Sequence, residues 1–139
     1  MDSATVDTLR SSFARIAAQK VDVAALFYER LFEVAPGVRP LFEADMADQQ
    51  KKLLAALVRI VQAVDKPDEL VPYLAALGRR HTTYGAKPEH YAVVGDVLLW
   101  TFERVLGPAF TPEVRAAWGS AYGAVSELMR EAAEGATPS

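Results

Sequence analysis

Apolar residues recur every three or four positions along most of the chain, which is the spacing of one face of an α-helix. The stripes differ in length and run over residues 6–16, 24–32, 53–64, 91–105 and 114–129. No comparable stretch alternates with a period of two, as a half-buried strand would. The pattern therefore predicts an all-α fold with five long helices and shorter helical pieces near 36–42 and 68–80.

Proline and threonine mark where these helices begin. Pro88 and Pro112 stand where a helix starts, because the first turn of a helix does not need their missing N–H groups. Thr111 precedes the second of these prolines and is an expected N-cap. The connections at 33–48 and 65–88 are long, polar and broken by proline. Helices that pack only on each other favour short loops, so these connections suggest helices arranged around something else.

Composition and charge narrow the class of protein. The 139 residues fit one domain, 1–139, with a loose C-terminal tail from about residue 135. Hydrophobic residues make up 51% and charged residues 24%, which is the usage of a folded globular chain. A net charge of −3 is a poor basis for holding nucleic acid or an anionic membrane. Because the N-terminal segment does not resemble a signal peptide and no apolar run approaches a membrane span, we expect a cytoplasmic protein.

Candidate metal ligands are few. Cysteine is absent, which excludes disulfides, thiol catalysis, iron–sulfur clusters and thiolate zinc sites. Imidazole comes only from His81 and His90. His81 ends a helical segment just before a predicted joint, and imidazole is the usual axial ligand of haem iron. A lone histidine near a helix end is also commonly a cap or a surface residue, so His81 alone decides nothing.

Three further residues stand at suggestive places. Tyr28 lies in the middle of an apolar helix face, Phe42 closes a proline-bounded turn, and Gln49 opens the next long helix. Each also has an ordinary explanation: Tyr28 and Phe42 as core residues, and Gln49 as a solvated residue in the first turn of a helix. Their order and spacing along the chain carry more information than any one of them.

With the sequence around them, these residues resemble the single-domain bacterial haemoglobins and the haem domain of flavohaemoglobins. The resemblance covers about residues 3–130. The motifs that carry it are Phe27-Tyr28-Glu29-Arg30-Leu31-Phe32, Leu41-Phe42, Asp48-Gln49, Lys87-Pro88-Glu89-His90-Tyr91, Val94-Gly95-Asp96-Val97-Leu98-Leu99 and Ala117-Trp118-Gly119-Ser120-Ala121-Tyr122-Gly123.

The resemblance implies a globin fold, with helices packed around one haem b. It implies that His81 is the proximal ligand of the iron and that Phe42 packs on the haem. Tyr28 and Gln49 would line the distal pocket, and Gln49 is preferred to Gln50 because it precedes the histidine by the family's interval. The other haem contacts that it implies are Leu53, Leu77, Tyr84, Tyr91 and Val94.

The chemistry of these residue types suits a pocket that retains oxygen. Oxygen held as this family holds it carries negative charge on its outer atom, and Tyr28 and Gln49 offer neutral hydrogen-bond donors. A bond to a charged acceptor is worth about 1.5–3 kcal/mol, so two donors would slow oxygen release, while carbon monoxide would gain less. Lys52 or Arg80 could pair with a haem propionate, or each could be a solvated surface charge.

The chain departs from the flavohaemoglobin pattern in two ways. It ends at Ser139 without flavin and nicotinamide domains, so we expect electrons to come from a separate reductase. The family also places a glutamate on the last helix, near the proximal histidine. Counting from Trp118, that position falls on Ala133, with Glu131 and Glu134 out of register. A missing carboxylate would weaken electron donation by His81 to the iron.

The sequence therefore predicts a monomeric or weakly dimeric globin that binds oxygen reversibly, with nitric oxide and carbon monoxide as further ligands. The alternative of a different class is an enzyme, a nitric oxide dioxygenase working with a partner reductase. A gas or redox sensor and a helical bundle without cofactor are two further alternatives.

Overall fold

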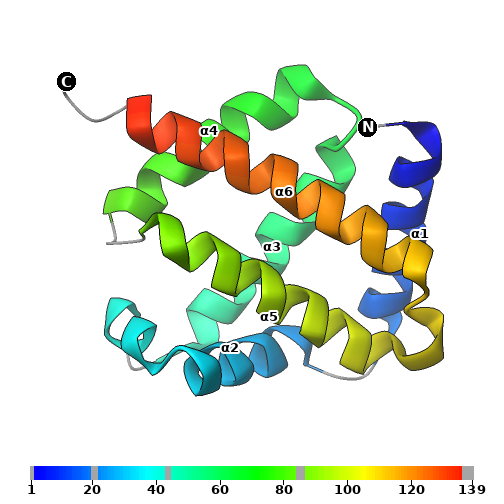
Figure 1. The fold of residues 1–139 in the computed structure, drawn as a ribbon, viewed down its shortest axis with the longest axis horizontal. Coiled ribbons are helices and arrows are strands. Elements are labelled where there is room, and N and C mark those ends of the chain that lie inside the picture. The colour runs from blue at the N-terminus through cyan, green and yellow to red at the C-terminus, as the bar shows by residue number, and fades with distance from the viewer. Residues whose placement is uncertain (1, 20–21, 43–44, 84–86, 136–139) are drawn as a thin grey trace.

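The computed structural model describes residues 2–19, 22–42, 45–83 and 87–135 (Figure 1). Within these ranges the chain is almost entirely helical and forms no strand, so the all-α prediction is confirmed. In chain order the elements are α1 (Ser3–Ala18), α2 (Val23–Val34), the 3-10 helix η1 (Pro36–Leu41), α3 (Ala47–Ala63), α4 (Pro67–Thr83), α5 (Pro88–Leu106), the 3-10 helix η2 (Gly107–Ala109) and α6 (Pro112–Gly135).

Local sequence sets the starts of the last two long helices as expected. Pro88 and Pro112 are the first residues of α5 and α6. The hydroxyl of Thr111 accepts a hydrogen bond from the backbone N–H of Val114 at 3.3 Å, which satisfies one of the free N–H groups in the first turn of α6. None of the helices described here is long and apolar enough to cross a membrane.

The main difference from the sequence prediction is α4. The segment predicted as a short piece near 68–80 is a helix of 17 residues, so the 65–88 connection is largely helical. Pro72 lies inside this helix and Gly78 near its end, and both residues disfavour a helix interior. The helix forms nevertheless, because α4 packs along α6 over much of its length. Tertiary packing here outweighs local propensity.

The core lies where α1, α2, α5 and α6 meet. Phe102 of α5 is fully buried and its ring lies 4.6 Å from that of Trp118. The indole N–H of Trp118 donates to the hydroxyl of Ser12 at 2.8 Å, so this large buried side chain has its one polar atom satisfied. Ser12 in turn donates to the carbonyl oxygen of Thr8 at 2.7 Å.

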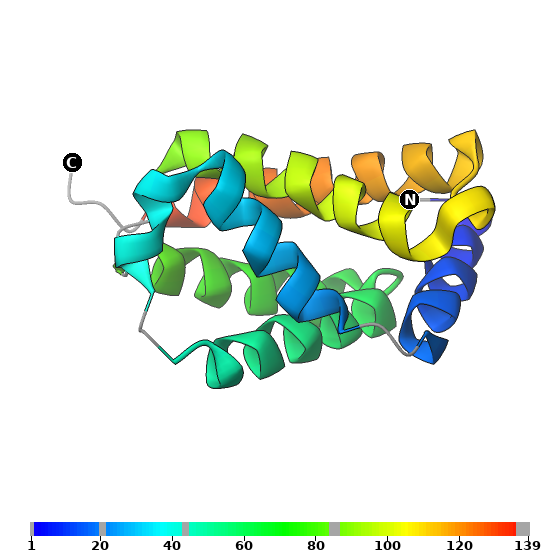
Figure 2. The same cartoon turned by 90° about the horizontal axis from the view of Figure 1, so that it is seen from below.

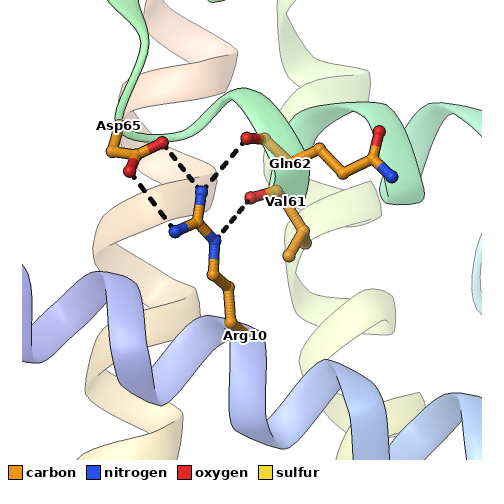
Figure 3. Close-up of polar contacts among 4 residues, drawn as sticks. All are labelled: Arg10, Val61, Gln62 and Asp65. Carbon is orange, nitrogen blue, oxygen red and sulfur yellow. Dashed lines mark hydrogen bonds and ion pairs between the residues drawn. The ribbon is translucent and has the colours of Figure 1, made fainter.

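Arg10 joins α1 to the end of α3 (Figure 3). Its guanidinium forms two bonds to the carboxylate of Asp65, at 2.7 and 3.3 Å, and donates to the carbonyl oxygens of Val61 and Gln62 at 3.4 and 3.1 Å. These carbonyls belong to the last turn of α3, where no further helical N–H is available. Arg10 therefore caps α3 and positions the corner between α3 and α4, and its hydrogen bonds lower the pKa of Asp65.

Two glycines allow neighbouring helices to approach closely. A Cβ built on Gly78 would lie 2.8 Å from the Cα of Met129, so α4 and α6 meet backbone to backbone at this point. On α5, a Cβ at Gly95 would lie 2.6 Å from the ring of Tyr122. The two glycines set how closely α6 packs on α4 and on α5.

We expect Gly78→Ala to lower the free energy of unfolding by about 1–3 kcal/mol, because the added methyl group meets rigid backbone and the two helices must separate. Gly119 and Gly123 of α6 are matched controls, since nothing lies within 4 Å of a Cβ at either position. Alanine there should raise stability by about 0.5–1 kcal/mol. Urea unfolding followed by circular dichroism measures all three, and a neutral Gly78→Ala would contradict the close packing.

Candidate functional site

Tyr28 and Gln49 form a hydrogen-bonded pair although they lie on different helices. Tyr28 stands on the buried side of α2, and Gln49 is in the first turn of α3. The side-chain amide of Gln49 donates to the hydroxyl oxygen of Tyr28 at 3.1 Å. Of the two adjacent glutamines, Gln49 is thus the one bonded to Tyr28. The structure brings together the two residues that the sequence predicts for the distal pocket.

The hydroxyl of Tyr28 is arranged as a donor. Burial raises the pKa of Tyr28, and the hydrogen bond from Gln49 opposes this only in part. The phenol is therefore protonated at neutral pH. Because its oxygen already accepts from Gln49, its O–H proton is available for a further acceptor.

Aromatic rings pack around the ring of Tyr28. The half-buried ring of Phe42 lies edge-on to Tyr28 at 5.6 Å, and Phe32 lies 5.5 Å from Phe42. Phe27 contacts Tyr28 edge-on at 5.0 Å. Phe32 was not among the predicted site residues, although its position four residues after Tyr28 places both on one face of α2. The polar pair thus lies in an apolar setting, where a hydrogen bond is stronger than in water.

His81 lies in the last turn of α4 with its side chain exposed. Its Nδ1 is 2.8 Å from the carbonyl oxygen of Leu77, one turn earlier. A carbonyl oxygen only accepts, so Nδ1 carries a proton, and in the neutral form of the ring Nε2 keeps its lone pair. A neutral imidazole held in this way by its backbone is suited to bind a metal ion through Nε2.

The helix arrangement brings the two predicted sides of the site to one end of the molecule. Arg59 of α3 lies over the ring of Tyr73 of α4, at 5.6 Å, so the two helices run antiparallel from their shared corner. Figure 2 shows them diverging from that corner, with the start of α3 and the end of α4 at the same end of the fold. Gln49 and His81 belong to these two helix ends.

The structure describes some of the remaining predicted haem contacts and not others. Leu53 and Val94 are half-buried and pack against the core, and Leu77 is half-buried. Tyr84 lies outside the described residues, as do the side chains of Ala133 and Glu134. Glu131 is exposed.

The two candidates for a propionate partner are both surface residues. Lys52 forms an exposed ion pair with Asp48 at 3.2 Å, one turn earlier on α3. Arg80 is exposed in the last turn of α4. Both positions suit a solvated charge, the alternative that the sequence left open.

Tyr91 carries a buried hydroxyl group with no hydrogen-bond partner among the residues that the structure covers. Its backbone carbonyl accepts from the hydroxyl of Tyr122 at 2.6 Å. Burial raises the pKa of Tyr91, so the phenol stays neutral. An unsatisfied buried hydroxyl costs about 1–3 kcal/mol.

We therefore expect Tyr91→Phe to leave the free energy of unfolding unchanged or to raise it by up to about 1 kcal/mol. The substitution keeps the ring and removes the unsatisfied hydroxyl, whose burial lowers the free energy of unfolding. Tyr28→Phe is the matched control, because it removes a hydroxyl that is bonded, and it should lower stability. If Tyr91→Phe proved as destabilising as the control in urea unfolding, its hydroxyl would have a partner.

This donor set fits a haem. The imidazole of His81 presents Nε2, the neutral donors Tyr28 and Gln49 stand on two other helices, and aromatic rings lie beside Tyr28. The other histidine is occupied: His90 Nδ1 accepts from the backbone N–H of Lys87 at 3.0 Å, as part of the cap of α5. Among the described residues, no group of three or more histidine, aspartate or glutamate side chains could hold a bare metal ion.

The chain is similar to two bacterial flavohemoproteins. The chain is 30% identical over 134 residues to the flavohemoprotein of Bacillus subtilis, and 33% identical over 128 residues to that of Rhodopirellula baltica. These alignments cover 93% and 90% of the chain but 33% and 31% of the relatives. The chain thus spans about a third of their length.

Two solved structures share the fold along their whole length. A bacterial globin from Campylobacter jejuni superposes with a TM-score of 0.84 at 21% identity, covering 96% of this chain and 97% of its own. An engineered carbene transferase from Rhodothermus marinus, described as a candidate nitric oxide dioxygenase, superposes with a TM-score of 0.86 at 27% identity, covering 97% and 94%. The family model described as Globin matches residues 25–129, about three quarters of the chain. This chain belongs to the globin family, and that membership implies haem binding.

Proposed function

We propose that this globin binds haem b through His81 and binds oxygen reversibly at a distal pocket made by Tyr28 and Gln49. The observation that carries the proposal is the bond from the Gln49 amide to the buried, neutral hydroxyl of Tyr28. It is supported by His81 on α4, at the same end of the fold, whose Nδ1 is bonded to the Leu77 carbonyl so that Nε2 can serve as a ligand. When bound, haem supplies a ferrous iron to which diatomic gases add.

Each residue of the proposed pocket has its own role in holding a gas ligand. The carbonyl of Leu77 orients the imidazole of His81. The hydroxyl of Tyr28 donates to a ligand that carries negative charge. Gln49 acts on Tyr28, because its amide donates to the hydroxyl oxygen and strengthens it as a donor. Phe32 and Phe42 keep the pocket apolar, which favours oxygen over water.

The test is the absorption spectrum of the purified protein, reconstituted with haem b and reduced. We expect a spectral change on adding oxygen that reverses on removing it. A chain that acquires no haem spectrum would contradict the site, and oxidation that proceeds without a reversible oxygen adduct would contradict oxygen binding while leaving the haem site intact.

A second candidate function is dioxygenation of nitric oxide to nitrate. It is favoured by the flavohemoprotein relatives and by the likeness to the Rhodothermus marinus protein. Each nitrate ion takes one nitric oxide and one oxygen molecule, and one electron must be returned to the ferric iron. A flavin reductase would supply that electron.

We therefore expect nitric oxide consumption by this protein, mixed with a generic flavin reductase and NADH, to be limited by reduction. The rate should rise in proportion to the reductase concentration. An electrode that follows nitric oxide measures it, and protein without reductase is the control. Rapid sustained consumption that does not depend on the reductase would overturn this expectation and favour the enzyme.

A further inference from the structure

A groove of about 470 Å³ lies where α2 packs against α5, which it crosses at an angle (Figures 1 and 2). We call it the α2–α5 groove. Four aliphatic side chains and Trp100 line it, together with two arginines and two carboxylates. Val34, at the end of α2, leaves 46% of its surface exposed. The groove therefore combines apolar and charged side chains and is open to solvent.

Trp100 gives this groove the composition of a protein interface. It is half-buried, and the guanidinium groups of Arg30 and Arg104 lie 4.7 and 5.2 Å from its ring. Tryptophan and arginine are the residues most enriched where protein–protein binding energy concentrates. Two guanidinium groups on the ring also hold it in place, so little side-chain entropy is lost when a partner covers it.

The charges of the groove point to one kind of partner. Arg30 and Arg115 stand among its lining residues with Asp96 and Glu103. Arg115 pairs with Glu103 at 3.4 Å, and both are exposed. Two positive and two negative side chains line the groove, so it has no net charge to attract a ligand that is wholly anionic or wholly cationic. A second copy of the same patch, turned by a two-fold axis, presents arginines to carboxylates and carboxylates to arginines.

We propose that the α2–α5 groove is the interface of a two-fold symmetric homodimer. Trp100 and Val34 form its apolar centre, and the groove arginines of one copy face the groove carboxylates of the other. The interface is independent of the proposed haem site. Arg30 follows Tyr28 by two residues, a rotation of about 200° around α2, so the two lie on opposite faces of that helix.

Sedimentation equilibrium of the purified protein tests the interface. We expect the mass to rise with concentration from 15.2 kDa toward twice that value. Val34→Lys should raise the dimer Kd about tenfold or more. The matched control is Val71→Lys on α4, which is 43% exposed and does not line the groove, and it should leave Kd unchanged. The proposal would be overturned if the protein stayed monomeric up to millimolar concentration. It would also be overturned if the two substitutions changed the dimer Kd equally.

A mixing experiment tests the two-fold charge exchange itself. One variant, Asp96→Lys with Glu103→Lys, carries only positive charges in the groove, and another, Arg30→Glu with Arg115→Glu, carries only negative ones. Far-UV circular dichroism verifies that each folds. Each should be monomeric alone because its charges repel across the axis, and the two should associate when mixed. If the mixture stays monomeric while the unmodified protein dimerises, the exchange is wrong; if either variant dimerises alone, the groove is not the interface.

Discussion

Haem retention should be lost in His81→Ala and kept in His90→Ala. The two histidines differ in which ring nitrogen is free. Nδ1 of His81 donates to the carbonyl oxygen of Leu77, which leaves the lone pair of Nε2 for the iron. In His90, Nδ1 accepts from the N–H of Lys87, so a neutral ring carries its proton on Nε2 and has no lone pair left there. Titration with haem, followed by absorbance and gel filtration, measures retention in both variants.

Stability measurements distinguish His81→Ala, which loses the iron ligand, from His90→Ala, which loses part of a helix cap. Haem that binds only the native state raises the melting temperature, so His81→Ala should lack the increase that haem gives to the unmodified protein. His90→Ala removes part of the cap of α5 and should cost about 0.5–2 kcal/mol, with or without haem. The reverse pattern of haem retention in the two variants would show that the iron ligand is misassigned.

Oxygen should dissociate about tenfold to a hundredfold faster from Tyr28→Phe than from the unmodified protein. The substitution keeps the ring and its contacts with Phe27 and Phe42, and removes only the hydroxyl. The range follows from the 1.5–3 kcal/mol of a hydrogen bond to a charged acceptor. Carbon monoxide carries less charge, so its dissociation should change less and serves as the control. Stopped-flow displacement measures both rates.

Gln49→Leu tests how the second residue of the pair acts. We expect oxygen release to speed up about tenfold, because the Tyr28 hydroxyl loses the amide that donates to it. If Gln49 acts wholly through Tyr28, the double variant should match Tyr28→Phe alone. Effects that multiply would mean that Gln49 contacts the ligand itself. Oxygen rates unchanged in both single variants would make Tyr28 and Gln49 core residues only.

Local features of the sequence were enough to predict most helices and the family. Apolar spacing located α1, α2, α3, α5 and α6, since each buries one stripe and shows its period directly. Pro88, Pro112 and Thr111 mark helix starts through properties of their own backbone or side chain. The ordered motifs from Phe27 to Gly123 indicated a globin, which the family match over residues 25–129 confirms.

Only the tertiary structure could decide features that depend on contacts between distant segments. The sequence underestimated α4, because Pro72 and Gly78 weaken its local pattern while packing on α6 holds it. Nothing near Gln49 in sequence shows that its amide meets Tyr28, 21 residues away on another helix. The α2–α5 groove likewise exists only once Val34 and Trp100 are brought together. The physical reason is the same in each case: helical periodicity reports which face of a helix is buried, whereas the partner of that face is set by how the helices cross.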